Sequence, residues 1–494
     1  MPFVQRIAYK APHTYFAGYL REILKDSSLK GFVSFSGDAV TLVLEEDTPE
    51  ALERFSTAIA RMLPYSLFMG PVDSHLQTEV PEMSDFTVEP AAVSLCPRCI
   101  QGLFDPASPD YQNQSMVCTH YGADLPHFEI TPVDIPAAVQ TLQEGSDVTI
   151  GDRTFRTTYR EGDTLFVTDA SRLNDLLLLS PQELNILLSI EKPLLKTAIQ
   201  DESLKTATGK NVIRVKLFDD APTALLARAL QQSGVPYLFM APYPDLEVAV
   251  NQEQVMLLRT PRLETPMQPL DDHPVLNRFL NMADEFDILG VSSIAAHLPR
   301  TGALNFILRS AKVNKPVIAF ERFKSRGFLE RITQASSAKA RLVENFREKF
   351  PDISKQLAML EDTDDTPLFT IIAAILGISG DYEAVHDASL GFVGNGGVKV
   401  DMKYAGGAFD YDALLASLMS FRLAGVATPL LAFSLFESLG DLMTDTLTQL
   451  KTRFKTSETL IFGGMLANAA LFSRIKKNYG HQNPRISSRF ALDD

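Results

Sequence analysis

The residues with the most distinctive chemistry lie in one short stretch, which begins at Cys96 and ends at Gly122. Cys96 and Cys99 form a Cys-x-x-Cys pair, and two thiolates at that spacing can share one tetrahedral zinc ion. A second pair is expected about 15–20 residues further on. Cys118 lies at that distance, but Tyr121 occupies the position of its partner. The spacing predicts that the three cysteines converge, whether or not zinc is bound.

A histidine would have to replace the missing fourth thiolate, since Cys3His sites also hold zinc. His120 and His127 are the two candidates near the end of this stretch. The alternative is a knuckle without metal, held by the aromatic side chains Phe104, Tyr111 and Tyr121. The predicted metal ligands are Cys96, Cys99, Cys118 and His120.

The residues around these cysteines resemble the zinc module of the HypF-type carbamoyltransferases, which help to build the cyanide ligands of nickel–iron hydrogenases. The chain keeps Cys-Pro-x-Cys at 96–99, Leu-Phe-Asp-Pro at 103–106, Tyr111 and Cys-Thr at 118–119. It departs from the pattern at Tyr121, where the family has its fourth cysteine. The family carries a second zinc module, which is absent or free of metal here, because no further cysteine follows.

Length and composition set the wider limits. A chain of 494 residues predicts several domains, and 45% hydrophobic with 22% charged residues is ordinary for globular protein. A net charge of −15 disfavours nucleic acid and anionic membrane surfaces as partners. Three cysteines form no disulfide framework and suit the reducing cytoplasm. Residues 1–10 lack the apolar core of a secretion signal, and no apolar run is long enough to insert into a membrane.

Residues 1–78 predict the order β-α-β-β-α-β. The spacing predicts a helix over 16–24, a hairpin of strands at 31–36 and 40–45, and a second helix over 49–63 with Thr48 as N-cap. This order and the Gly-Phe-Val sequence at 31–33 resemble the acylphosphatase domain of the HypF family, which is ferredoxin-like. Ala17 and Phe35 stand where that domain has its phosphate-binding Arg and its Asn. The resemblance therefore implies the fold without the activity, with Arg21 as the nearest arginine.

Residues 79–135 form the zinc-knuckle-like segment, and residues 136–270 more faintly resemble the YrdC-like α/β domain of the same family. We predict strands at 148–158, 164–168, 192–196 and 236–241, and helices at 180–188 (with a Ser180–Glu183 capping box) and 221–233. The family closes a basic cavity for an adenylated intermediate with a Thr-Ser-Gly-Asn turn, which aligns here with Ala-Pro-Tyr-Pro at 241–244. The candidate cations, expected to be solvated, are Arg156, Arg160, Lys192 and Lys196.

A proline-rich stretch at 261–274 predicts a linker, and residues 271–494 resemble the carbamoyl-transferring, ATPase-like (ASKHA) domain in part. The predicted elements are a helix at 275–283, strands at 288–294 and 315–320 flanking a helix at 302–311, helices within 325–360, a helix at 371–377, a hairpin at 392–404, and helices at 411–423 and 430–453. A strand at 459–462 then leads into Gly463, Gly464 and Asn468, the candidate nucleotide-binding residues, because a Gly-Gly turn before a helix suits an anion.

The resemblance covers most of the chain in domain order: multi-domain α+β and α/β, with acylphosphatase-like (1–78), zinc-knuckle-like (79–135), YrdC-like (136–270) and partial ASKHA-like (271–494) parts. Apolar or aromatic residues replace the family's polar ones at Ala17, Phe35, Tyr121, Pro242 and Phe462. We therefore predict a HypF-like accessory protein for nickel–iron hydrogenase maturation or assembly that binds a hydrogenase subunit or other maturation proteins in the cytoplasm, with catalysis lost. The alternatives are an active ATP-dependent carbamoyltransferase with a rebuilt site and a nucleotide-binding regulator. Zinc is the candidate cofactor, and ATP is not expected.

Overall fold

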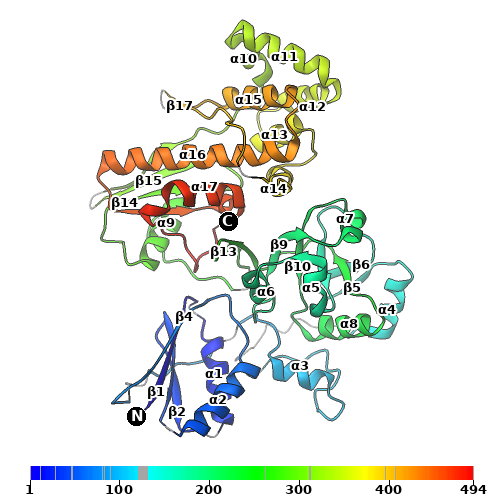
Figure 1. The fold of residues 1–494 in the computed structure, drawn as a ribbon, viewed down its shortest axis with the longest axis vertical. Helices are drawn as coiled ribbons and strands as arrows, with labels where there is room; N and C mark the ends of the chain where they lie inside the picture. Colours follow the sequence, from blue (N-terminus) through cyan, green and yellow to red (C-terminus); the bar gives the residue numbers. More distant parts are fainter. Residues whose placement is uncertain are drawn as a thin grey trace. The chain divides into compact units, whose positions relative to one another are not determined.

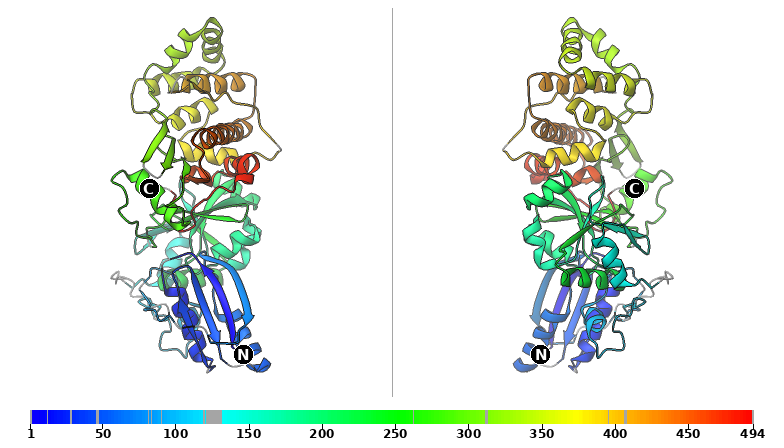
Figure 2. Two further views of the ribbon diagram at one scale, coloured as in Figure 1. Left: turned by 90° about the vertical axis from the view of Figure 1, so that its left-hand side faces the viewer. Right: turned by 90° about the vertical axis from the view of Figure 1, so that its right-hand side faces the viewer.

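The computed structural model describes the chain except for residues 1, 12, 28, 46–47, 81, 83, 90, 119, 121–131, 262, 311–312, 395, 406–407 and 493–494. The chain divides into two compact units (Figures 1 and 2). Unit 1 comprises Met1–Thr265 with Ser488–Ala491, and unit 2 comprises Pro266–Ser487 with Leu492–Asp494. The boundary falls inside the predicted linker at 261–274. Among the described residues, no helix combines the length and the apolar character needed to cross a membrane.

The first part of unit 1 has the predicted β-α-β-β-α-β order. Its elements are β1 (Phe3–Tyr9), α1 (Tyr15–Asp26), β2 (Gly31–Phe35), β3 (Ala39–Leu44), α2 (Pro49–Met62) and β4 (Met69–Leu76). The sheet is antiparallel throughout, in the order β2-β3-β1-β4, and both helices cover one of its faces (Figure 1). The hairpin turns at Gly37, whose φ of 82° is one that glycine adopts without strain. The turn residues and the apolar faces of the two helices are therefore enough to predict the order of elements in this part of unit 1.

A second sheet fills the rest of unit 1. It has nine strands in the order β13-β12-β9-β10-β7-β11-β6-β5, with β8 paired to β9, and it contains both parallel and antiparallel pairs. The elements are α3 (Pro97–Phe104), α4 (Ile135–Gln143), β5 (Val148–Ile150), β6 (Arg153–Arg156), β7 (Thr164–Val167), η2 (Ala170–Arg172), α5 (Leu173–Leu176), β8 (Leu177–Leu178), α6 (Pro181–Leu187), β9 (Leu194–Ile199), α7 (Glu202–Thr208), β10 (Val212–Lys216), α8 (Ala221–Gln232), β11 (Tyr237–Met240), β12 (Glu247–Asn251) and β13 (Gln254–Arg259). The predicted capping box at Ser180 and Glu183 is present at the start of α6.

A buried carboxylate ties the two sheets of unit 1 together. Glu191, just before β9, is fully buried and accepts hydrogen bonds from the Tyr15 hydroxyl of α1 (2.7 Å), the Ser66 hydroxyl (2.5 Å) and the Leu67 backbone N–H (3.0 Å). Burial raises the pKa of this carboxyl above its ordinary value. A buried charge that accepts three hydrogen bonds depends on all of them, because its desolvation is otherwise uncompensated.

We expect Glu191→Ala to lower the free energy of unfolding by about 3 kcal/mol, because it leaves buried hydroxyl and amide donors without an acceptor. Chemical denaturation of the variant measures the loss, and the exposed Glu82→Gln is the control.

Stability should also depend on pH through Glu191. The Glu191 carboxyl keeps its proton to a higher pH in the folded state than in the unfolded state, where its pKa is near 4.5. Glu191 therefore makes stability fall as the pH rises above that value. This contribution should be missing in Glu191→Ala, and an unchanged stability would contradict the assignment.

Unit 2 is built on a four-stranded sheet in the order β16-β15-β14-β19, in which β14 and β19 are parallel. Its elements are α9 (Pro274–Glu285), β14 (Ser293–His297), β15 (Asn305–Ser310), β16 (Val313–Ala319), α10 (Phe328–Ala335), α11 (Ser337–Lys349), α12 (Pro351–Glu361), α13 (Leu368–Leu376), α14 (Tyr382–Leu390), β17 (Tyr404–Ala405), β18 (Ala408–Phe409), α15 (Tyr411–Leu423), α16 (Thr428–Phe454), β19 (Glu458–Phe462), η3 (Gly464–Ala467), α17 (Ala469–Tyr479) and η4 (Gly480–Gln482). The long helix α16 passes over this sheet (Figure 1). Most predicted helices of this region are confirmed.

Two predicted elements of unit 2 are wrong. The predicted helix at 302–311 is strand β15, which pairs with β14 on one side and β16 on the other. Its short apolar run is compatible with either element, and strand pairing decides the outcome. The predicted hairpin at 392–404 is also wrong: backbone N–H groups of Val398 and Val400 donate instead to the hydroxyls of Ser434 and Ser438 on α16. The turn residue Asn395 lies outside the described residues.

Smaller corrections concern the bounds of predicted elements and the elements that the sequence does not predict. The predicted strand at 288–294 begins only at Ser293, as β14, and the predicted strand at 192–196 begins at Leu194, as β9. Lys192, just before β9, has a φ of 45°, which a regular strand does not accommodate. The predicted single strand at 148–158 is two antiparallel strands, β5 and β6, because the chain turns at Gly151, whose φ is 61°. The sequence does not predict several elements that the structure shows, which are α3, α4, α7, β10, β12, β13 and α14.

Candidate metal centre

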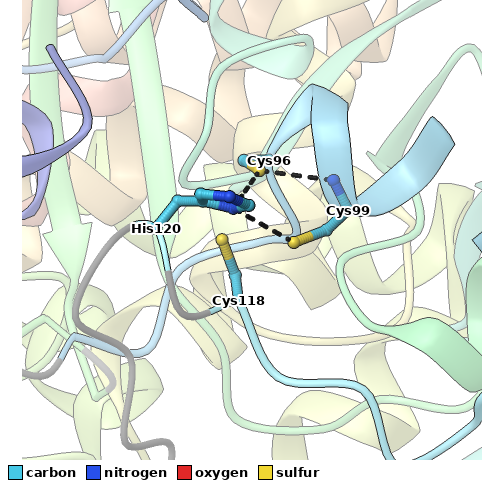
Figure 3. A group of neighbouring side chains, drawn as sticks. All are labelled: Cys96, Cys99, Cys118 and His120. Atoms are coloured by element: carbon cyan, nitrogen blue, oxygen red, sulfur yellow. Dashed lines mark hydrogen bonds between the residues drawn. The ribbon is translucent and has the colours of Figure 1, made fainter. Parts of the chain in front are cut away.

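Helix α3 positions the first two cysteines. Cys96 is its N-cap residue, Pro97 is the first helical residue, and the Cys99 backbone N–H donates to the Cys96 sulfur at 3.4 Å. A proline at this position is already in a helical conformation and has no N–H to satisfy. The helix start therefore turns both thiols to the same side, as Figure 3 shows.

The other two ligands approach the same point from a later segment (Figure 3). His120 Nδ1 lies 3.3 Å from the Cys96 sulfur and 3.5 Å from the Cys99 sulfur. The ligand atoms of Cys96, Cys99, Cys118 and His120 all lie within 4.8 Å of one another. The predicted convergence of the three cysteines is confirmed, and His120 is the histidine that joins them. His127 and Tyr121 lie outside the described residues.

This donor set fits zinc. Zinc–sulfur bonds of about 2.3 Å and zinc–nitrogen bonds of about 2.0 Å place ligand atoms of a tetrahedron about 3.5 Å apart, close to the distances around His120 Nδ1. All three cysteines are buried, so the thiols are shielded from solvent. A metal such as zinc could be held by three thiolates and one imidazole, with no position left for a substrate, which is the pattern of structural sites.

The thiols also influence one another's pKa. Hydrogen bonds from Cys118 and Cys99 lower the pKa of Cys96 to about 2. Hydrogen bonding to Cys96 raises the pKa of Cys118 to about 12, and bonding to Cys118 and Cys96 raises the pKa of Cys99 well above its ordinary value. A divalent cation bound at the cluster would favour the thiolate form of the cysteines, because metal binding displaces their protons.

Ala17 and Phe35, which the sequence comparison placed at the expected acylphosphatase positions, are packed against other side chains. Ala17 is fully buried in α1. Phe35 lies 6.3 Å from the Tyr9 ring and 6.2 Å from the Phe86 ring. Arg21 stacks over Phe86 at 4.5 Å and donates to its carbonyl oxygen at 3.2 Å. Both interactions fix the Arg21 side chain against Phe86, and the sequence did not indicate this contact.

A buried ion network includes Tyr243, in the Ala-Pro-Tyr-Pro stretch at 241–244, and the residues around it. Lys216, at the end of β10, has no exposed surface, and its Nζ contacts Asp245 at 2.5 Å and Asp219 at 3.0 Å. The Tyr243 hydroxyl donates to Asp245, and Arg153 pairs with Asp219 at 2.6 Å. Sequence reasoning missed Lys216 and Arg153. The available signal was a lysine ending an apolar strand and followed closely by two aspartates.

The candidate cations of this region need one correction. Arg156 is buried, not solvated, and it pairs with Asp147 and Asp163 at 3.5 Å each. It lies on β6 inside the sheet, where a charged side chain requires such partners. Arg160 is exposed, as predicted. Lys192 and Lys196 are half-buried rather than fully solvated, and the Lys192 ammonium donates to a backbone carbonyl.

The Gly-Gly turn after β19 is packed by the chain itself. Gly463 has a φ of 114°, and a Cβ atom there would lie 2.3 Å from the backbone of Leu298. The Phe462 ring stacks on His297 at 4.7 Å. The Asn468 side chain caps α17 through the N–H groups of residues 470 and 471 and donates to the Ser389 hydroxyl. Each of these residues therefore has a structural role.

Comparison with known structures defines the class: the chain has the fold of HypF proteins. It aligns with a crystal structure of HypF from T. kodakarensis with a TM-score of 0.69 and 13% identity, covering 100% of this chain and 97% of the other. It also aligns with full-length HypF in a phosphate- and nucleotide-bound form, with a TM-score of 0.60, 13% identity, and coverage of 100% and 96%. The HypF resemblance read from the sequence is thereby confirmed for the fold.

A curated relative is more similar in sequence. Protein HydE from Wolinella succinogenes is 25% identical over 329 residues, an alignment that covers 59% of this chain and 59% of that protein. The chain thus matches about three fifths of the length of its curated relative. No protein-family model matches the chain.

Proposed function

We propose that this protein is a HypF-like accessory factor for the maturation or assembly of nickel–iron hydrogenase, and that it acts by binding rather than by catalysis. The HypF fold and the specific zinc-module motif support the connection to hydrogenase. The proposal places the protein in the cytoplasm, where free thiols persist. Its partner would be a hydrogenase subunit or another maturation protein.

One observation carries the binding-only proposal: the positions where the family keeps polar chemistry are filled by groups that the fold itself uses. Phe35 packs among aromatic rings, Tyr243 bonds to Asp245, and Phe462 stacks on His297. In the YrdC-like region the cations Lys216 and Arg153 are already neutralised by buried carboxylates. Groups engaged in this way are not available to bind a phosphate or an acyl group.

We assign the parts by the same reasoning: acylphosphatase-like (1–78), zinc-knuckle-like (79–135), YrdC-like (136–270) and partial ASKHA-like (271–494). The antiparallel order β2-β3-β1-β4 supports the first assignment. The parallel pair β14–β19, followed by a glycine turn and helix α17, supports the last. These names describe similarity in fold and carry no activity.

The test of the proposal is co-purification from cells that make a nickel–iron hydrogenase. The tagged chain should retain a hydrogenase subunit or another maturation protein, and the same tag alone should not. Turnover of ATP with carbamoyl phosphate by the purified chain would contradict the proposal and identify an active carbamoyltransferase.

We also expect millimolar Mg-ATP to leave the melting temperature unchanged, because the Leu298 backbone packs directly against Gly463 in the turn. A ligand that binds only the native state would add about 2.7 kcal/mol at a hundredfold excess over its dissociation constant. Thermal melts of the wild type and Gly464→Val measure this. A rise in the wild type that disappears in the variant would instead identify a nucleotide-binding protein.

A further inference from the structure

We propose a second metal site, in unit 2, formed by Glu383, His386 and Asp387 on helix α14. Their ligand atoms, one from each side chain, all lie within 4.8 Å of one another. They occupy positions i, i+3 and i+4, which lie on one face of a helix. Glu-x-x-His at i and i+3 is a spacing by which helices supply metal ligands in carboxylate-bridged iron and manganese proteins. The cluster contains no sulfur and is distinct from the cysteine site of unit 1.

The limit of 4.8 Å on the distances between ligand atoms is compatible with a shared ion. Oxygen and nitrogen ligands lie about 2.1 Å from a small divalent cation, so neighbouring ligand atoms are about 3 Å apart and opposite ones about 4.2 Å apart. Small side-chain rotations would bring the three ligand atoms to such separations. His386 is buried, with the rings of Tyr382 and Phe436 at 5.7 and 6.4 Å. Such apolar surroundings restrict the imidazole and limit solvent around a bound cation.

The surrounding residues orient the ligands. The buried Arg300 guanidinium donates to one Glu383 oxygen at 3.0 Å, as second-layer partners of ligating carboxylates do. The Asp381 side chain caps the helix by accepting from the Glu383 N–H, which fixes the first turn where the cluster begins.

The cluster also lies at a position in the fold where ligands commonly bind. Arg300 follows β14 and approaches the Gly464 carbonyl oxygen, which follows β19, at 3.5 Å. These strands are parallel, so the cluster lies beyond their carboxyl ends, where α/β sheets commonly bind ligands. The Asn468 side chain donates to Ser389 and so joins α14 to the same turn. Carboxylate and imidazole donors without sulfur suit Mn²⁺, which we take as the probe.

The experiment is a Mn²⁺ titration of the full chain loaded with one equivalent of zinc and freed of excess zinc, because excess zinc would compete with Mn²⁺ for carboxylate and imidazole ligands. Binding is followed by the loss of the electron paramagnetic resonance signal of free Mn²⁺. We expect one Mn²⁺ per wild-type chain and at least about tenfold weaker binding in Asp387→Asn and His386→Gln, since even outer-layer changes cost that much. Asp352→Asn, a matched change at an exposed position of α12, is the control and should bind like the wild type.

Circular dichroism and thermal melts establish that each variant is folded. If His386→Gln does not fold, Asp387→Asn decides the question, because Asp387 is less buried. Cys96→Ser should keep the Mn²⁺ affinity, which separates this site from the cysteine site. The proposal is wrong if the wild type binds no Mn²⁺, or if Asp387→Asn binds it as tightly as the wild type.

Discussion

Replacing Cys118 by serine should abolish zinc binding and lower the stability of unit 1 by about 4 kcal/mol when zinc is a thousandfold above the dissociation constant of the wild type. The physical reason is that Cys118 supplies the ligand that joins a later segment to the start of α3, where Cys96 and Cys99 lie. Without it, two thiols and one imidazole remain, and a closed tetrahedral site cannot form. Atomic emission measures the zinc content, and thermal melts measure the stability.

The matched control is a chelator added to both proteins. It should lower the melting temperature of the wild type and leave Cys118→Ser unchanged, because the variant has no zinc to lose. His120→Ala should weaken zinc binding, whereas His127→Ala should not, if His120 is the fourth ligand as the geometry indicates. A wild type purified without zinc and unable to bind it would contradict the prediction.

Zinc affinity should also fall as the pH is lowered. Zinc binding displaces protons from thiols, and the pKa values of Cys99 and Cys118 are raised by their hydrogen bonds within the cluster. Protons therefore compete with the metal at these two positions below those pKa values, and more strongly as the pH falls. A zinc titration at several pH values with proton release measured by calorimetry tests this. Affinity independent of pH would show that these thiols do not ligate the metal.

Gly463→Ala should lower the stability of unit 2 by about 4 kcal/mol, from about 1–3 kcal/mol of backbone strain and a similar cost of overpacking. A methyl group there would collide with the Leu298 backbone, which cannot rotate away as a side chain can. The Leu298 N–H donates to the Phe462 carbonyl oxygen, and the Met465 N–H donates to the Leu298 carbonyl oxygen, so a shift would also break hydrogen bonds between β14 and the turn.

Gly425→Ala is the matched control, because Gly425 also has a positive φ, 83°, but nothing lies within 4 Å of the added atom. The free energy of unfolding of Gly425→Ala should fall by the backbone strain alone, roughly 1–2 kcal/mol. Chemical denaturation of both variants gives the two values. Equal losses would show that the contact with Leu298 is not what requires glycine at 463.

The sequence alone determined the features that depend on neighbouring residues. The Cys-Pro-x-Cys start of α3, the hairpin at Gly37, the capping box at Ser180 and helix α15 all follow from interactions within a few residues of each other. The β-α-β-β-α-β order and the HypF resemblance are of this kind, because element order and motif spacing are written along the chain. The convergence of the three cysteines was predictable for the same reason.

Only the tertiary structure decided the features that depend on partners distant in sequence. Residues 305–310 form a strand because β14 and β16 flank them, although their apolar run also suits a helix. Lys216 is buried because Asp245 and Asp219 neutralise it, and no local pattern reports that pairing. The link between Glu383 and the β19 turn exists because β14 pairs with β19, which brings Arg300, just after β14, close to Gly464. Each such contact between distant residues costs loop-closure entropy. These contacts are therefore stable only when many of them form together in the folded state.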